Sequence, residues 1–80
     1  MAHYYFDLRD GDELIIDQEG LELRDTMAVR REAALTLSGL ARDSVQSFNA
    51  AQSHQMAIAV RDERGSVMEV KFSFEIVRKQ

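Results

Sequence analysis

Hydrophobic residues change their period along the chain, and this change limits the folds that the sequence can adopt. Apolar and polar residues alternate from Tyr4 to Leu8 and again from Met56 to Ile76, which is the pattern of strands with one buried face. Residues 26–48 instead repeat apolar side chains every three or four positions, which predicts an amphipathic helix. The expected fold is α+β, in the order β-β-α-β-β: an antiparallel four-stranded sheet with one long helix packed on one face.

The first hairpin is predicted to turn through a three-residue loop, Asp10–Asp12. This loop places Leu8 opposite Leu14 and so keeps apolar side chains together on one face of the sheet. A two-residue loop of Asp10 and Gly11 would instead set Leu8 against Glu13. We therefore expect the three-residue loop.

A second turn or bulge is predicted at Asp17–Gly20, with Gly20 at positive φ, before Leu21–Leu23 resume an extended chain. Asp25 then has the position and the side chain of a helix N-cap, and the helix is expected to run from Thr26 to Phe48. Residues 49–55 are polar and are predicted to form a loop. The predicted buried face of the helix consists of Ala33, Ala34, Leu37, Leu40, Ala41, Val45 and Phe48.

The last third of the chain is predicted to form a second hairpin, whose turn has Asp62 first and Gly65 fourth. The expected cross-strand pairs are Val60 with Met68, Ile58 with Val70 and Met56 with Phe72. The final strand, residues 67–78, is longer than its expected partner, residues 56–62. Part of its edge is therefore predicted to lack a partner, which favours self-association.

Length and composition favour one soluble domain, residues 1–80. No basic segment precedes an apolar run near the N-terminus, and the longest apolar run, Met56–Val60, is far too short to cross a bilayer. The chain has no cysteine, which excludes disulfides, thiolate nucleophiles and cysteine-based metal sites. We expect a cytoplasmic protein that does not bind membranes.

The net charge of −4 is unevenly distributed. Residues 1–25 carry eight acidic and two basic side chains, whereas residues 26–80 carry six acidic and eight basic ones. Nucleic-acid binding requires clustered Lys and Arg, so we expect no nucleic-acid partner. An RNA-binding sheet face would also need several aromatic side chains, and Tyr5 is the single aromatic residue expected on the open face.

Chemical motifs are absent from the sequence. A calcium loop that begins at Asp10 would need an oxygen ligand and a glycine where Leu14 and Ile15 stand. His3 and His54 are isolated, and no spacing is typical of a catalytic triad or a zinc site. We predict no catalytic residue, no metal and no cofactor, and therefore no enzyme; a small hydrolase-type enzyme is the remote alternative.

Several patches together resemble a family of short alphaproteobacterial proteins that is catalogued as a domain of unknown function. The resemblance covers almost the whole chain and is most specific over the first 33 residues; Arg24 departs from it, because that family often has proline there. It implies a standalone small protein but no activity, substrate or cofactor. The residues that carry it are Tyr4–Gly11, Asp17, Glu19–Leu23, Asp25, Ala28, Glu32, Ala33, Asp62, Glu63 and Gly65.

A weaker similarity relates the chain to HicB-type antitoxins. It consists of a short hairpin, an acidic glycine-containing turn, Asp25 and Thr26, and then Glu32 and Ala33 in an amphipathic helix. Those antitoxins neutralise a basic partner toxin, so the resemblance implies a basic partner protein.

The hypothesis that we favour from the sequence is a non-enzymatic interaction module that self-associates through its sheet edge or open face. The alternative is an antitoxin-like subunit whose acidic first hairpin meets a basic partner. The expected partner is therefore another copy of the chain or another protein. The residues assigned to a possible interaction surface are Tyr5, Arg9, Asp10, Asp17, Glu19, Leu35, Lys71 and Val77.

Overall fold

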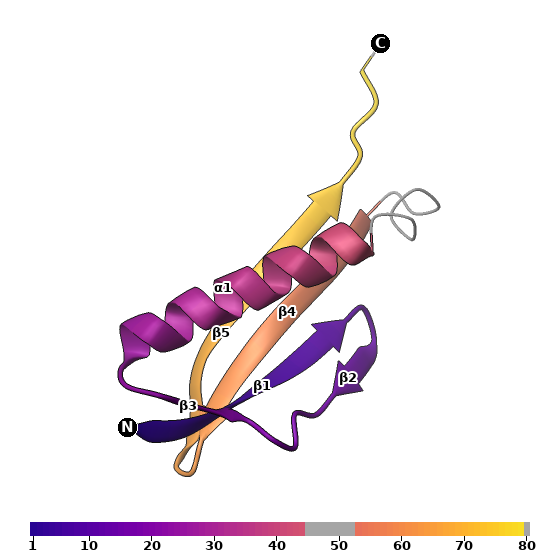
Figure 1. The fold of residues 1–80 in the computed structure, drawn as a ribbon. Coiled ribbons are helices and arrows are strands. Elements are labelled where there is room, and N and C mark those ends of the chain that lie inside the picture. Colours follow the sequence, from indigo (N-terminus) through magenta and orange to yellow (C-terminus); the bar gives the residue numbers. More distant parts are fainter. Residues whose placement is uncertain (45–52, 80) are drawn as a thin grey trace.

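The computed structural model describes residues 1–44 and 53–79. Three strands, one helix and two further strands follow one another along these residues (Figure 1). This is the α+β arrangement that the hydrophobic periods predict. The predicted core positions Val45 and Phe48, and the predicted loop residues 49–52, lie outside the described residues. The elements are β1 (Ala2–Asp10), β2 (Glu13–Ile15), β3 (Leu21–Leu23), α1 (Thr26–Asp43), β4 (Ser53–Asp62) and β5 (Gly65–Glu75).

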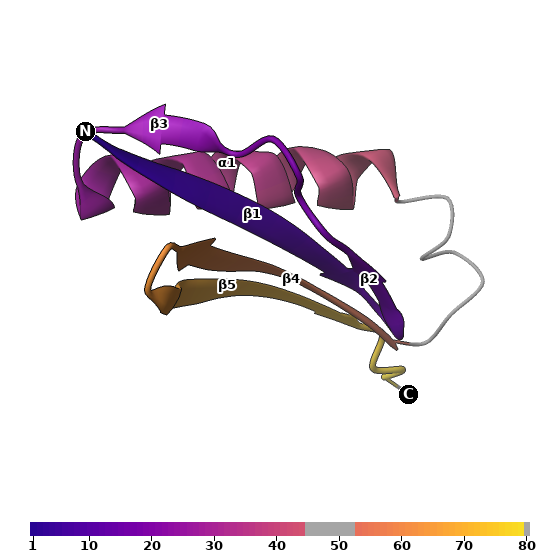
Figure 2. The same cartoon turned by 90° about the horizontal axis from the view of Figure 1, so that it is seen from below.

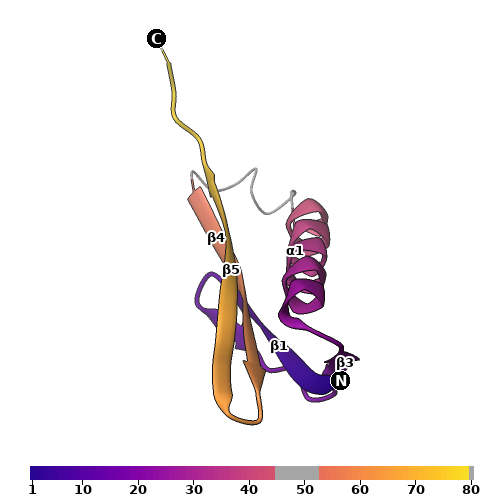
Figure 3. The ribbon, with the colours of Figure 1, turned by 90° about the vertical axis from the view of Figure 1, so that its left-hand side faces the viewer.

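The strands form one antiparallel sheet in the order β2-β1-β4-β5, and β3 also pairs with β1. β1 is central because it pairs with β2 and β3 of the first hairpin and with β4 of the second. The helix lies on one face of this sheet, as Figures 2 and 3 show from two sides. The buried core lies between them and includes Tyr4, Val29, Leu37, Ile58 and Val60.

The register of the first hairpin differs from the prediction. A two-residue turn of Gly11 and Asp12 places Leu8 opposite Ile15, not Leu14. Gly11 has a φ of 62°, the positive value that a type II′ turn requires at its first loop position. The prediction was wrong because it assumed that burial of Leu14 sets the register; that side chain is 53% exposed, so the turn sets it instead.

The return strand is split into β2 and β3 by residues 16–20, which include the turn or bulge predicted at Asp17–Gly20. β2 pairs with the C-terminal part of β1, and β3 pairs with Ala2–Tyr4 at the start of β1. Gly20 has a φ of 69°, which confirms the positive φ expected there.

The helix begins as predicted. Asp25 is extended, with a φ of −158°, and its Oδ1 accepts a hydrogen bond from the Ala28 amide at 2.8 Å. The buried side chains are Val29, Ala33, Leu37 and Ala41, four positions apart. This stripe is narrower than the predicted face: Ala34 is exposed, and Val29, which the prediction omitted, is fully buried.

The second hairpin confirms all three predicted pairs, Val60 with Met68, Ile58 with Val70 and Met56 with Phe72. Its outer end does not match the prediction. β4 begins at Ser53, which pairs with Glu75 at the end of β5. The predicted overhang of the final strand is therefore absent, and residues 53–55 belong to a strand instead of a loop.

The helix covers the sheet unevenly. It contacts β4 and β5 along its length and reaches β3 near its start. In Figure 1, β2 lies away from the helix on the far side of β1. Phe6 and Leu8 of β1 are consequently only partly buried, although their side chains pack against the core.

Candidate functional site

A buried carboxylate lies on the sheet face opposite the helix. Asp7 is 7% exposed, and its Oδ2 accepts a hydrogen bond from Arg61 Nε of β4 at 2.8 Å. Its Oδ1 accepts from the Asp17 amide at 2.9 Å. Arg61 Nη2 also donates to the Asp17 carbonyl at 3.0 Å. Asp7 and Arg61 therefore join the split return strand to both central strands.

Where the return strand is split between β2 and β3, the side chain of Asp17 takes the place of a strand partner for β1. Its Oδ2 accepts from the Phe6 amide of β1 at 3.0 Å, and its Oδ1 accepts from the amides of Glu19 and Gly20, each at 3.1 Å. A short side chain that accepts from nearby amides is what favours Asp in such turns. Asp17 is thus a structural acceptor that holds the turn against β1.

Several opposing influences act on the pKa of Asp17. Burial works to raise it, but the hydrogen bonds from the amides of Phe6, Gly20 and Glu19, together with the positive charge of Arg61, outweigh burial and lower the pKa below its ordinary value. The carboxylate is accordingly charged at neutral pH.

This lowered pKa predicts a loss of stability in acid. The unfolded chain binds the proton more readily than the folded chain does, so the contribution of Asp17 is complete above its ordinary pKa, near pH 4, and disappears as pH falls through the folded value. We expect Asp17→Asn to flatten the dependence of unfolding free energy on pH below about pH 4, measured by urea unfolding. Asp12→Asn, at an exposed turn residue, is the control and should keep the wild-type slope. An unchanged slope in Asp17→Asn would contradict this role.

Two aromatic rings extend this cluster along the same face. The Arg61 guanidinium carbon lies 4.4 Å from the centroid of the Tyr5 ring, and the His3 and Tyr5 rings meet edge to face at 5.0 Å. His3 Nε2 donates to the Glu19 carbonyl at 2.8 Å. Tyr5 therefore packs against its neighbours within the sheet.

A second ionisable pair lies at the other end of β1. His54 Nε2 of β4 and Asp10 Oδ1 are 2.6 Å apart, next to the β1–β2 turn. The Gly11 amide donates to the Gln55 carbonyl at 3.0 Å in the same region. His54 thus fastens the turn of the first hairpin to β4.

The largest run of exposed apolar side chains follows this turn. Leu14, Ile15 and Ile16, which we call the β2 edge, are 53%, 54% and 50% exposed. A shallow groove of about 420 Å³ lies beside them; Phe6 and Leu8 line it from β1, and Ile15 and Ile16 line it from the β2 edge. Residues 17–19 close one end of this β2 groove. Exposed apolar side chains on an edge strand are suited to binding another polypeptide.

Comparison with known proteins gives one result. Residues 3–73 match the model of a domain of unknown function, DUF6894. The chain belongs to the DUF6894 family. No curated protein and no solved structure matches it significantly.

In this DUF6894 domain the predicted surface residues do not form one patch. Asp17 and Glu19 lie together at the end of the β2 groove. Tyr5 and Arg9 lie on the open face, whereas Leu35 is 60% exposed on the helix. Lys71 shares the open face with Arg9, because both pair with Ala57, and the two side chains line one pocket. Asp10 instead pairs with His54, and Val77 follows the end of β5.

Sequence reasoning did not single out the β2 edge of the DUF6894 domain or the pair of Asp7 and Arg61. The sequence did contain a signal for this edge, the three successive aliphatic residues Leu14–Ile16. Successive side chains of a strand point to opposite faces, so a strand cannot bury all three on one face. Asp7 and Arg61 are 54 positions apart, and no short-range pattern connects them.

Residues 1–44 and 53–79 contain no candidate for a metal site or for a membrane-spanning helix. No group of three or more His, Asp or Glu side chains in this part of the DUF6894 domain could hold a metal ion. No described helix is both long and apolar enough to cross a membrane. Every buried side-chain polar atom described has a hydrogen-bond partner.

Proposed function

We propose that the DUF6894 domain is a non-enzymatic protein-interaction module that contacts its partner through the β2 edge. The observation that carries this proposal is the exposure of three successive aliphatic side chains, Leu14–Ile16, on and directly after the edge strand β2, beside a groove that apolar and polar residues line together. Burying such side chains against a partner is favourable because it removes apolar surface from water. Single exposed apolar residues such as Leu35 need no such explanation.

Charge favours a different protein over a second copy at this edge. Residues 10–23 contain six acidic side chains and no Lys or Arg. Two β2 edges placed side by side would bring these acids together, which is unfavourable. The overhang predicted for the final strand is absent, although β5 is the other edge strand of the described sheet. We therefore rank a basic partner protein, as the resemblance to HicB-type antitoxins implies, above a second copy.

Affinity purification of the tagged domain from its native host tests this proposal. We expect Ile15→Ser to lose a protein that the wild type and a matched control, Leu35→Ser, both retain; each replaces a half-exposed aliphatic residue, one on the edge and one on the helix. The retained protein is then purified, and its affinity for Ile15→Ser should be at least tenfold weaker. If no retained protein depends on Ile15, or if Leu35→Ser loses the same protein, the β2 edge is not the contact surface.

A further inference from the structure

The partner that this edge accepts can be specified further, on the basis of the proposed function. We infer that the β2 edge takes an extended, basic segment of a partner protein, which adds to the sheet as a new strand beside β2 and places apolar side chains against Ile15. The backbone, the groove and the surrounding charge each support one part of this inference.

The backbone of β2 is available for strand addition. β2 pairs with β1 on one side, and no strand within the described residues pairs with its other side. Successive residues of a strand direct their amide and carbonyl groups to alternate edges, so part of the backbone of β2 faces outward. An extended peptide can pair with these groups, as in other cases of strand addition.

The β2 edge selects apolar side chains on one face of the added strand. Ile15 pairs with Leu8, so both side chains lie on the helix face of the sheet, and Phe6 lies two positions from Leu8 on that face. The helix packs over β4 and β5 and leaves this corner open (Figure 1). Every second residue of an added strand would lie on this face, next to Ile15.

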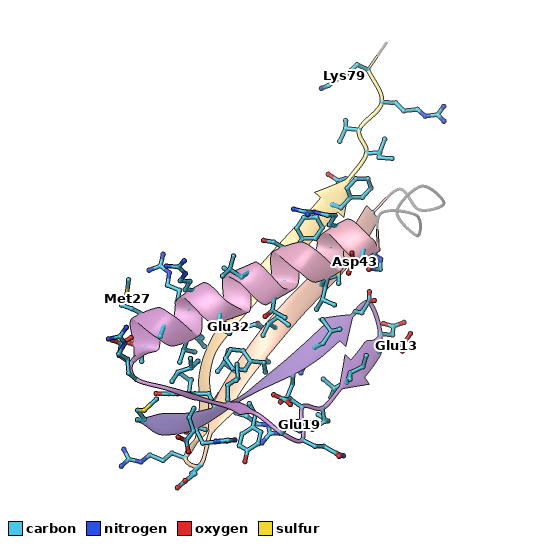
Figure 4. All side chains as sticks on the ribbon, viewed as in Figure 1. Glu13, Glu19, Met27, Glu32, Asp43 and Lys79 are labelled. Carbon is cyan, nitrogen blue, oxygen red and sulfur yellow. The ribbon has the colours of Figure 1, made fainter. Side chains whose placement is uncertain are left out.

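Acidic side chains lie at one end of the groove and at the turn before β2. Asp12 and Glu13 lie at the turn, and Asp17 and Glu19 lie at the split of the return strand. Figure 4 shows Glu13 and Glu19 at the two ends of this segment. Lys or Arg in the partner segment would complement these charges. The same acids oppose edge-to-edge pairing of two identical chains.

Two blocked nine-residue peptides, one alternating Val and Lys and one alternating Val and Glu, test this inference by NMR titration of the isotopically labelled full chain. We expect the Lys peptide to shift the amides of residues 13–17 and to bind at least tenfold more tightly than the Glu peptide, with an affinity that falls as salt rises. Ile15→Ser should weaken binding about tenfold, and Leu35→Ser should leave it unchanged. A Lys peptide that is N-methylated at alternate residues should not bind, because it cannot complete the strand pairing.

The possible failures are distinguishable. If the two peptides bind equally, or the shifts lie on β5, the basic-strand inference is wrong, while a host protein that depends on Ile15 would still support the proposed function. If light scattering shows a dimer that Ile15→Ser dissociates, the occupant is a second copy, and the inference of a basic partner is overturned.

Discussion

Replacing Gly20 by alanine is expected to be among the most destabilising single substitutions in this domain. Gly20 has a φ of 69°, which costs an L-residue roughly 1–2 kcal/mol. A Cβ there would lie 2.6 Å from both His3 Nε2 and the Tyr4 carbonyl oxygen, and the backbone oxygen cannot move aside without disturbing β1. We expect a loss of about 3 kcal/mol and a fall in Tm of roughly 10–20 °C.

Two other glycines provide matched controls for this prediction. Gly65 has a φ of 126° but open space around its missing Cβ, so Gly65→Ala isolates the cost of the backbone conformation. Gly39 lies in the helix with nothing within 4 Å, and Gly39→Ala should stabilise the protein by about 1 kcal/mol. Thermal unfolding followed by circular dichroism measures all three. A loss at Gly20 no greater than the roughly 1–2 kcal/mol of the left-handed backbone alone would contradict the predicted clash.

Replacing Asp7 by alanine should lower stability by about 1–3 kcal/mol. The substitution leaves the Asp17 amide without its acceptor and Arg61 without its carboxylate. The Arg61 side chain is 37% exposed and can be hydrated instead, so the loss comes mainly from the hydrogen bonds of the buried Asp7 carboxylate. The split of the return strand should loosen at the same time, since the Asp17 amide is one of its links to β1.

A double-mutant cycle with Arg61→Ala tests this coupling by urea unfolding. Arg61→Ala should destabilise the wild type but have a smaller effect once Asp7 is absent. Glu69→Ala removes the partner of the exposed Lys71 and should change stability by less than about 0.5 kcal/mol. Additive effects of the Asp7 and Arg61 substitutions would show that the two side chains act independently.

The order of the elements was predictable because each depends on local patterns. Alternation located the strands, the side chain of Asp25 located the start of the helix, and Asp62 with Gly65 located the second turn. In the second hairpin, burial specifies the register, because a shift of one residue would expose Ile58 and Val60. The three predicted pairs there were therefore correct.

The first hairpin shows where this reasoning fails. Leu14 and Ile15 are exposed whichever face they occupy, so hydrophobicity alone does not specify their register. The proposed interaction surface was only partly predictable for a similar reason. Acidic residues of the first hairpin were recognised, but the groove depends on the helix lying over β4 and β5 instead of over β1, and this is a tertiary property.

The central position of β1 has a consequence for the folding kinetics. Its pairing with β2 closes a short loop, whereas its pairing with β4 joins residues such as Asp7 and Arg61 that are 54 positions apart. Long loops are entropically costly to close, and proteins rich in distant contacts fold slowly. The two hairpins are therefore expected to form early and separately, and the rate-limiting step is expected to be the docking of β4 against β1 that unites the two halves of the sheet.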